Sequence, residues 1–242
     1  MLFRSEYAER RRRLLAALGD GAALVCAPAR PIGEEGERRS TASSDLHYLT
    51  GWTTGRAAAL FRPGAEAPVV FFVDPRSLRH EAVTGERPGL DEALAHHGAG
   101  HVFPFEALEK ELPWLLEGYP ELQYRFGQPD GIDELVLPAL RRAASGRSGL
   151  RAPLRVADDD HVGQLRLVKS AAELSILRRA GAISSEAHRL AMGEGRAGVF
   201  EYELEALVDG TFRRRGGNGP GYDSIVGSGP NACVLQIGRA HV

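Results

Sequence analysis

The amino-acid sequence predicts an α/β domain over residues 1–150, followed by a second, α+β region over residues 158–235. In the first region, short apolar runs bounded by turn residues alternate with helical patterns, which is typical of an α/β domain. A stretch rich in Gly, Ser and Arg, residues 146–153, then separates the two regions. Two long amphipathic patterns follow it, and they indicate a different architecture for the second region.

The elements of the first region follow from apolar periodicity and from the Gly and Pro residues that interrupt it. A helix is predicted from Tyr7 to Leu18, where Gly19-Asp20-Gly21 stops it. Strands are predicted at residues 22–27, 46–50, 57–61, 69–73 and 122–126. Further helices are predicted near residues 77–83, 90–97, 105–116 and 132–144.

The composition excludes several classes of function. The 242 residues are 43% hydrophobic, which is enough to bury a sizeable core. A net charge of −2 gives no basic surface for nucleic acid or an anionic membrane, so we expect neither as a partner. Two cysteines imply no disulfide framework, and no apolar stretch approaches the ~20 residues of a membrane span. We therefore expect a cytoplasmic protein.

Two clusters of polar residues invite a metal-site interpretation. His97 and His101 are four residues apart and could chelate a metal on a helix, but Gly98 and Gly100 would interrupt that helix. Histidines at a helix end or on the surface are the favoured interpretation. The run Asp158-Asp159-Asp160-His161 cannot easily converge on one ion, so a linker or a helix N-terminus explains it better.

The second region begins with a helix-start signal. Ser170 and Glu173 have the spacing of a capping box, and the apolar residues that follow step by four and three along one helical face. We expect Gly193 and Gly195 to end this helix. A second amphipathic helix is predicted to begin near Phe200 and to stop at Gly216-Gly217.

A Gly-rich segment follows these helices. Two apolar runs, residues 224–226 and 232–235, flank the turn formers Gly227-Ser228-Gly229-Pro230-Asn231, which predicts a hairpin. Glycine on both sides of Ser228 permits positive φ and close approach of the backbone to another group. The residues alone leave open whether this turn is an ordinary connection or a functional loop.

The same segment resembles the stretch that enters the active site of aminopeptidase P, the X-Pro aminopeptidase branch of the creatinase, prolidase and methionine aminopeptidase superfamily. That family has the form Tyr-x-Ser/Thr-Ile-Val-Gly-Ser-Gly-x-Asn-x-Cys-x-Leu, followed at once by His-Tyr. The matching positions here are Tyr222, Ile225, Val226, Gly227, Ser228, Gly229, Asn231, Cys233 and Leu235. The next position departs from the pattern, because Gln236 stands where the family has its histidine.

Other blocks extend the resemblance along the chain. Residues 44–52, SDLHYLTGW, are similar to the family's Ser-Asp-Phe-Tyr-Tyr-Leu-Thr-Gly-Phe. Asp74-Pro75-Arg76 follows its next block, although Val83 replaces the family's usual tryptophan there. Residues 166–170 with Glu173 are similar to the opening of the family's catalytic domain. The resemblance implies a creatinase N-terminal-like α/β domain, followed by the first half of an α+β pita-bread catalytic domain.

The resemblance also implies a chemistry. It predicts the N-terminal fragment of a dinuclear-metal X-Pro aminopeptidase, which hydrolyses the bond before a penultimate proline and forms a homo-oligomer when full length. Two manganese ions are expected in that full-length protein. The family's metal ligands, two aspartates, a histidine and two glutamates, all lie beyond Leu235, so we expect this chain to bind no metal and to be inactive.

The resemblance further suggests which residues serve the site. Tyr222 and Asn231 are expected near the substrate. Gln236 occupies the position of the family's active-site histidine; it can donate a hydrogen bond, but it cannot carry charge or shuttle a proton.

The last residues and the exact branch of the family have alternative interpretations. One reading frame of a common sequencing adapter encodes Ile237–Val242, so residues 236–242 are expected to be non-native; a divergent C-terminus in a short paralogue is the alternative. A prolidase or creatinase-type hydrolase shares this architecture. A metal-free pita-bread protein that works as a binding module is a further alternative.

Overall fold

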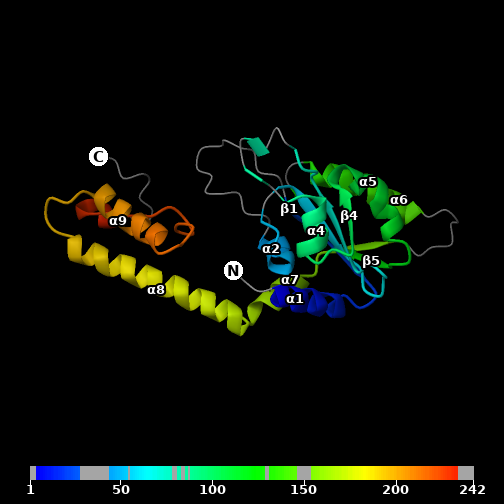
Figure 1. Ribbon diagram of the computed structural model, residues 1–242, viewed down its shortest axis with the longest axis horizontal. Helices are drawn as coiled ribbons and strands as arrows, with labels where there is room; N and C mark the ends of the chain where they lie inside the picture. Colours follow the sequence, from blue (N-terminus) through cyan, green and yellow to red (C-terminus); the bar gives the residue numbers. More distant parts are fainter. Residues whose placement is uncertain are drawn as a thin grey trace. The chain divides into compact units, whose positions relative to one another are not determined.

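The computed structural model describes residues 4–27, 44–53, 55–77, 81–82, 85–86, 88–128, 131–145 and 154–233 of the chain. The chain divides into two compact units, Met1–Val168 and Lys169–Val242. Figure 1 shows both units, with the sheet in the first and the helices α8 and α9 in the second. Within the described residues, none of the helices is both long enough and apolar enough to cross a membrane.

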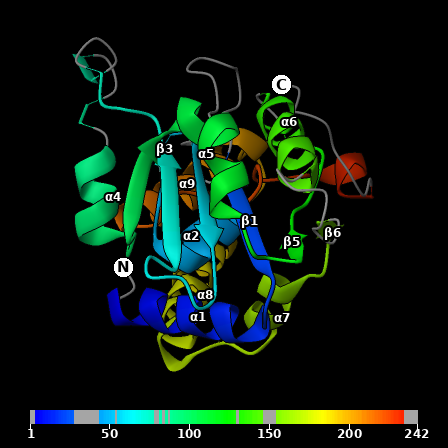
Figure 2. The same ribbon diagram turned by 90° about the vertical axis from the view of Figure 1, so that its right-hand side faces the viewer.

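A mixed six-stranded sheet forms the centre of the first unit (Figure 2). Its order is β4-β3-β2-β1-β5-β6. The strands are β1 (Ala22–Ala27), β2 (Ala57–Phe61), β3 (Val69–Val73), β4 (His101–Pro104), β5 (Glu121–Gln123) and β6 (Arg155–Ala157). Strand β2 is antiparallel to both of its neighbours, β1 and β3, whereas β4, β5 and β6 each pair in parallel with the strand beside them.

Helices cover both faces of this sheet. Residues of α1 (Arg4–Ala17), α2 (Ser44–Thr50), α4 (Leu90–His96) and α7 (His161–Leu167) contribute to one hydrophobic cluster. Residues of η1 (Phe105–Ala107), α5 (Leu108–Leu115) and α6 (Ile132–Ser145) contribute to a second cluster on the opposite face. Every residue of β2 and β3 is buried, which explains why these strands read as continuous apolar runs.

Most of the predicted elements of this unit are confirmed. The strands at residues 22–27, 57–61 and 69–73 form as predicted, and β5 is shorter than the run that indicated it. The helix near residues 105–116 begins as the 3₁₀ turn η1 and continues as α5. The helix expected near residues 77–83 falls largely outside the described residues. The sequence did not indicate the short strands β4 and β6, and it indicated the start of α7 only as one of two explanations for residues 158–161.

One strand prediction is wrong, because residues 46–50 belong to the helix α2. The buried residues Leu46, Leu49 and Thr50 recur at the spacing of one helical face, and this packing against α1 and the sheet decides the conformation. The Thr50 hydroxyl also donates to the Leu46 carbonyl at 2.6 Å, one helical turn earlier. A run of five residues was too short to separate this period from that of a strand.

The second unit consists of α8 (Ala171–Glu194), α9 (Glu201–Arg214) and the 3₁₀ helix η2 (Gly229–Cys233). The two long helices are confirmed, but the predicted hairpin is wrong in its described part. Residues 224–226 form no strand, residues 232–233 belong to η2, and residues 234–235 lie outside the described residues. A strand needs a neighbour for its backbone hydrogen bonds, and a two-stranded hairpin is only marginally stable without a larger sheet. The described part of this unit contains no sheet.

Candidate functional site

The helix α8 begins at the capping box that the sequence predicts. The Ser170 hydroxyl accepts a hydrogen bond from the Glu173 backbone N–H at 3.2 Å, and the Glu173 carboxylate accepts one from the Ser170 N–H at 2.9 Å. Both bonds satisfy N–H groups that have no partner inside the helix. The helix then extends over 24 residues and is capped by Gly195. This long helix forms one wall of a groove.

The groove has a volume of about 700 Å³ and lies between α8, α9 and the segment 217–226. Apolar side chains of both helices line it, together with Ser184 and His188. The His188 ring contacts the Ser184 carbonyl through Nδ1 at 2.8 Å, so one of its two ring nitrogens already has a partner within α8. Tyr222 lines the groove while its side chain remains 80% exposed. The groove is therefore largely apolar, and its lining includes a tyrosine that is exposed to solvent.

The Gly-rich loop of residues 227–231 is held by one carboxylate of α9. Glu201 Oε1 accepts hydrogen bonds from the Ser228 backbone N–H at 2.6 Å, from the Ser228 hydroxyl at 2.9 Å and from Asn231 Nδ2 at 3.3 Å. The backbone N–H of Ser228 has the largest effect on the pKa of Glu201; together with the two side-chain donors it lowers that pKa below its usual value. The carboxylate is thus ionised at neutral pH and fixes the loop.

The three site residues suggested by the sequence have different positions. Tyr222 lies on the groove, whereas Asn231 belongs to η2 and is bonded to Glu201 rather than lining the groove. Gln236 lies outside the described residues. Glu201 was not predicted as a site residue, because no spacing rule links a residue at the start of one helix to a loop 27 residues later.

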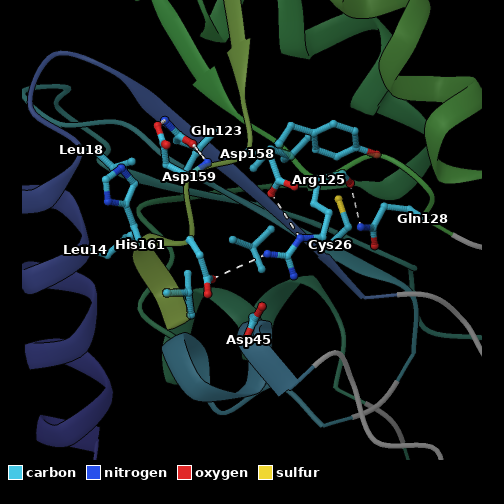
Figure 3. A pocket seen from close by; sticks show the side chains of 16 residues that line it. Leu14, Leu18, Cys26, Asp45, Gln123, Arg125, Gln128, Asp158, Asp159 and His161 are labelled. Carbon is cyan, nitrogen blue, oxygen red and sulfur yellow. Dashed lines mark hydrogen bonds and ion pairs between the residues drawn. The ribbon is translucent and has the colours of Figure 1, made fainter. Parts of the chain in front are cut away.

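A second, smaller pocket of about 140 Å³ lies in the first unit, near the carboxyl ends of β1 and β5 (Figure 3). The carboxyl ends of parallel strands are common ligand sites in α/β sheets. Acidic residues gather here, and the side chains of Asp45, Asp158, Asp159, Asp160 and His161 line the pocket with Arg125.

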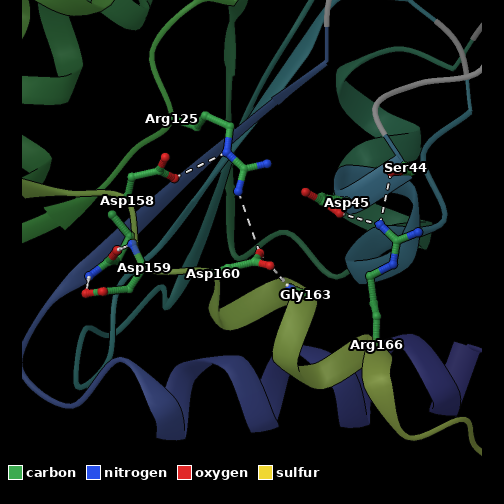
Figure 4. Close-up of polar contacts among 9 residues, drawn as sticks. Ser44, Asp45, Arg125, Asp158, Asp159, Asp160, Gly163 and Arg166 are labelled. Atoms are coloured by element: carbon green, nitrogen blue, oxygen red, sulfur yellow. Dashed lines mark hydrogen bonds and ion pairs between the residues drawn. The ribbon is translucent and has the colours of Figure 1, made fainter.

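The acidic side chains of this pocket have partners within the protein (Figure 4). Arg125 donates to Asp158 at 3.2 Å and lies 3.7 Å from Asp160, while Asp160 accepts from the Gly163 N–H at 3.0 Å as the N-cap of α7. Asp45 forms an ion pair with Arg166. Residues 158–161 therefore lead into a helix N-terminus, which is one of the two explanations that the sequence favoured over a metal site.

The histidine pair His97 and His101 does not form a metal site. The His97 ring lies against Trp52 and donates through Nδ1 to the Thr50 carbonyl at 2.9 Å. His101 belongs to the strand β4, and its ring packs on Phe103. Across the described ranges, no three or more His, Cys, Asp or Glu side chains lie together so that they could hold a metal ion.

Comparison with protein families identifies both units. The family described as "Aminopeptidase P, N-terminal domain" matches residues 7–123, and "Metallopeptidase family M24" matches residues 175–241. The two matches follow one another along the chain in the order that the sequence predicts.

Individual relatives agree with these matches. The Xaa-Pro aminopeptidase of Escherichia coli is 33% identical over 239 residues, which are 96% of this chain and 54% of that protein. The human Xaa-Pro dipeptidase is 44% identical over 78 residues, or 32% of this chain and 16% of that protein. Nearly all residues of this chain are matched in the Escherichia coli aminopeptidase, but the chain spans only about half the length of that protein.

Solved structures give the same result. Proline aminopeptidase P II from Yersinia pestis has a TM-score of 0.88 at 33% identity, covering 100% of this chain and 57% of that one. Aminopeptidase PepP from Pseudomonas aeruginosa has a TM-score of 0.89 at 33% identity, covering 100% of this chain and 56% of that one. The chain belongs to the aminopeptidase P family, and it combines that family's α/β N-terminal domain with part of an M24 pita-bread domain.

Proposed function

We propose that the chain is the N-terminal part of a dinuclear-metal X-Pro aminopeptidase. Such an enzyme hydrolyses the bond between an N-terminal residue and a following proline, so its partners are peptides with proline at the second position. One observation carries the proposal: the similarity to the Escherichia coli Xaa-Pro aminopeptidase extends over 96% of this chain and thus includes both units. We further propose that the full-length protein is a cytoplasmic homo-oligomer.

The site residues of this proposal lie in the second unit. Tyr222 and Asn231 would face the substrate, and position 236 would supply the family's active-site histidine, which is Gln236 here. The open groove beside Tyr222 supports the assignment of that residue, whereas the assignment of Asn231 rests on its place in the family motif. A glutamine at position 236 could donate a hydrogen bond to the substrate, but it could not take up a proton.

The described residues do not fit a metal pair, because none of their acidic and histidine side chains form a suitable group. One similar solved structure is a zinc-substituted Escherichia coli aminopeptidase P in complex with product. We propose that two manganese ions bind the full-length protein through a second half of the catalytic domain. On this proposal residues 1–150 and 158–235 are the two domains, residues 236–242 are a non-native tail, and the chain alone is inactive.

Sequencing the source locus from the codon of Leu235 onward tests this proposal. The expected result is a continuation as His-Tyr, followed by two aspartates, a histidine and two glutamates as metal ligands. The protein encoded by that locus should release the first residue of an X-Pro peptide with added manganese, whereas residues 1–242 should not. An uninterrupted locus that encodes Gln236–Val242 and then stops would contradict the proposal, and so would activity of residues 1–242 alone.

A dipeptidase is a second candidate, because the human Xaa-Pro dipeptidase is more similar locally, at 44% identity over 78 residues. The two activities differ in the length of their substrate. If the protein encoded by the source locus hydrolyses X-Pro dipeptides but no X-Pro tripeptides, the dipeptidase is favoured. The reverse preference favours the aminopeptidase.

A further inference from the structure

The helix α9 contacts the segment after it at two points. Near its start, Glu201 accepts three hydrogen bonds from Ser228 and Asn231. Two turns later, Asp209 Oδ1 accepts a hydrogen bond from the Ser224 hydroxyl at 2.6 Å. The later residue of the helix contacts the earlier residue of the segment, so the segment runs back along α9 in the opposite direction.

The segment between these two contacts has about the length that is needed to follow α9. Glu201 and Asp209 are eight residues apart, which corresponds to about 12 Å along a helix axis. Ser224 and Ser228 are four residues apart and can span at most about 14 Å when fully extended. Residues 224–228 are thus long enough to follow α9 between the two carboxylates, and no described strand pairs with them.

The loop then turns back toward the same carboxylate. Gly229 has φ of +50°, a conformation that favours glycine, and the η2 turn that starts there returns Asn231 to Glu201. In the described part of the chain, no cation is paired with Glu201. Its charge is instead compensated by the loop, since all three donors meet at Oε1.

This contact also fixes which end of the Asn231 amide faces outward. A carboxylate can only accept, so the NH₂ group of Asn231 must face Glu201. The described residues offer no second partner to the amide oxygen of Asn231, which leaves it able to accept a hydrogen bond from a peptide N–H. Without Glu201, either end of the amide could face the substrate.

We propose that Glu201 is a positioning residue: with Asp209 it holds residues 224–231 along α9 and presents the Asn231 amide oxygen to a peptide substrate. The presentation of Asn231 to a substrate rests on the proposed function, whereas the holding of residues 224–231 by Glu201 and Asp209 does not. Glu201 acts only through Ser228 and Asn231 and needs no contact with the reacting atoms.

A spin label on Cys233 tests the proposal directly. Cys233 is the last residue of η2 and is exposed, whereas Cys26, the other cysteine of the chain, is buried in β1. In residues 1–242, electron paramagnetic resonance at neutral pH should show a predominantly immobile label. Glu201→Gln should raise the ratio of mobile to immobile label several-fold, because the loop donors lose their charged acceptor. Glu205→Gln, on the same helix, should leave the spectrum unchanged.

The pH dependence separates this role from a general loss of structure. Because the pKa of Glu201 is lowered, the contact should persist below the usual carboxyl range and be lost only as the pH falls through that lowered value. Asn231→Asp should behave in the opposite way, because it places a second carboxylate against Glu201. The label should therefore be mobile at neutral pH. It should become less mobile on acidification, when one of the two carboxyl groups takes up a proton.

The outcomes are distinct. A Glu201→Gln spectrum equal to that of the unsubstituted chain, with unchanged helix content by circular dichroism, overturns the proposal. If Glu201→Gln lowers the helix content, the Asn231→Asp variant tests the proposal instead. Acidification that does not reduce the mobility of the label in that variant also overturns the proposal. Since these readouts involve neither metal nor substrate, an immobile label in residues 1–242 would leave the holding of the loop by Glu201 in place even if the protein encoded by the full locus lacked X-Pro activity. That lack of activity would refute the proposed function alone.

Discussion

Trp52 presents an unsatisfied donor in the core of the first unit. The residue is 1% exposed and packs against Phe71 and His97, but its indole N–H finds no hydrogen-bond acceptor among the described residues. The aminopeptidase P pattern has phenylalanine at this position, which would bring no such donor into the core. A buried donor without a partner costs about 1–3 kcal/mol.

We therefore expect Trp52→Phe to change the free energy of unfolding by less than about 1 kcal/mol, because the removed donor offsets the lost contacts. Trp52→Ala loses the contacts of the whole ring and should cost about 3–5 kcal/mol. Urea unfolding followed by circular dichroism measures both. A Trp52→Phe loss as large as that of Trp52→Ala would show that the indole N–H carries no penalty.

His97 gives the first unit a dependence on pH. Burial lowers the pKa of His97 below its usual value, outweighing the bond to the Thr50 carbonyl, so the folded state disfavours the charged ring. The unfolded chain binds the proton more readily, and stability present above about pH 6.5 is lost as the pH falls toward the lowered pKa.

The expected result is a fall in the free energy of unfolding between about pH 6.5 and the folded-state pKa, with this residue contributing at most about 1.4 kcal/mol per pH unit. His97→Gln keeps an N–H donor for the Thr50 carbonyl and removes the titration. The difference in urea stability between the two proteins should therefore vary with pH. A constant difference from pH 7.5 to 5.5 would mean that His97 does not titrate differently on folding.

At the scale of elements, the start of α8 depends on the Ser170 side chain. Its hydroxyl satisfies the Glu173 N–H, and replacing a serine N-cap by alanine costs about 1 kcal/mol. We expect Ser170→Ala to reduce the helix content of the second unit. Ser170→Asp, which keeps an acceptor at the cap, should retain it. Circular dichroism at 222 nm checks both, and equal signals for the alanine and aspartate variants would contradict the expectation.

The same element shows which parts of the fold the sequence could predict. The Ser170 capping box and the apolar face of α8 are local signals, so both were predicted correctly. Residues 46–50 fold as a helix because of packing against α1 and the sheet, which no five-residue pattern contains. Residues 224–226 have strand-like residues but no described partner strand, so their propensity alone does not form a sheet.

The candidate site likewise contains residues that the sequence could predict and residues that it could not. Tyr222 and Asn231 belong to a recognisable motif, and the structure places the first on a groove and the second on Glu201. The roles of Glu201 and Asp209 depend on how α9 and residues 224–231 lie side by side. That arrangement depends on contacts between segments that are distant in the sequence, so a local motif does not predict it.

At the scale of the molecule, the two units differ sharply in burial. The first has a hydrophobic cluster on each face of its sheet, with side chains such as Phe61, Phe71 and Phe72 fully buried. Among the described residues of the second unit, only Ala187 and Thr211 are buried, while apolar side chains of α8 and α9 remain exposed, including Ile176, Leu177, Met192 and Tyr202. Small cores contribute little free energy, so the second unit gains little stability from packing.

This difference in burial predicts that the second unit, Lys169–Val242, unfolds locally while the sheet of the first unit remains folded. Hydrogen exchange of residues 1–242, read by mass spectrometry of peptic peptides, should show fast exchange across α8 and α9 and slow exchange across β1, β2 and β3, because local opening costs least where few apolar contacts are buried. Raising the protein concentration should slow exchange in α8 if its exposed apolar residues drive self-association. Equal protection of the helices and the strands at the lowest concentration would show that the second unit is stabilised by more than the contacts described for it.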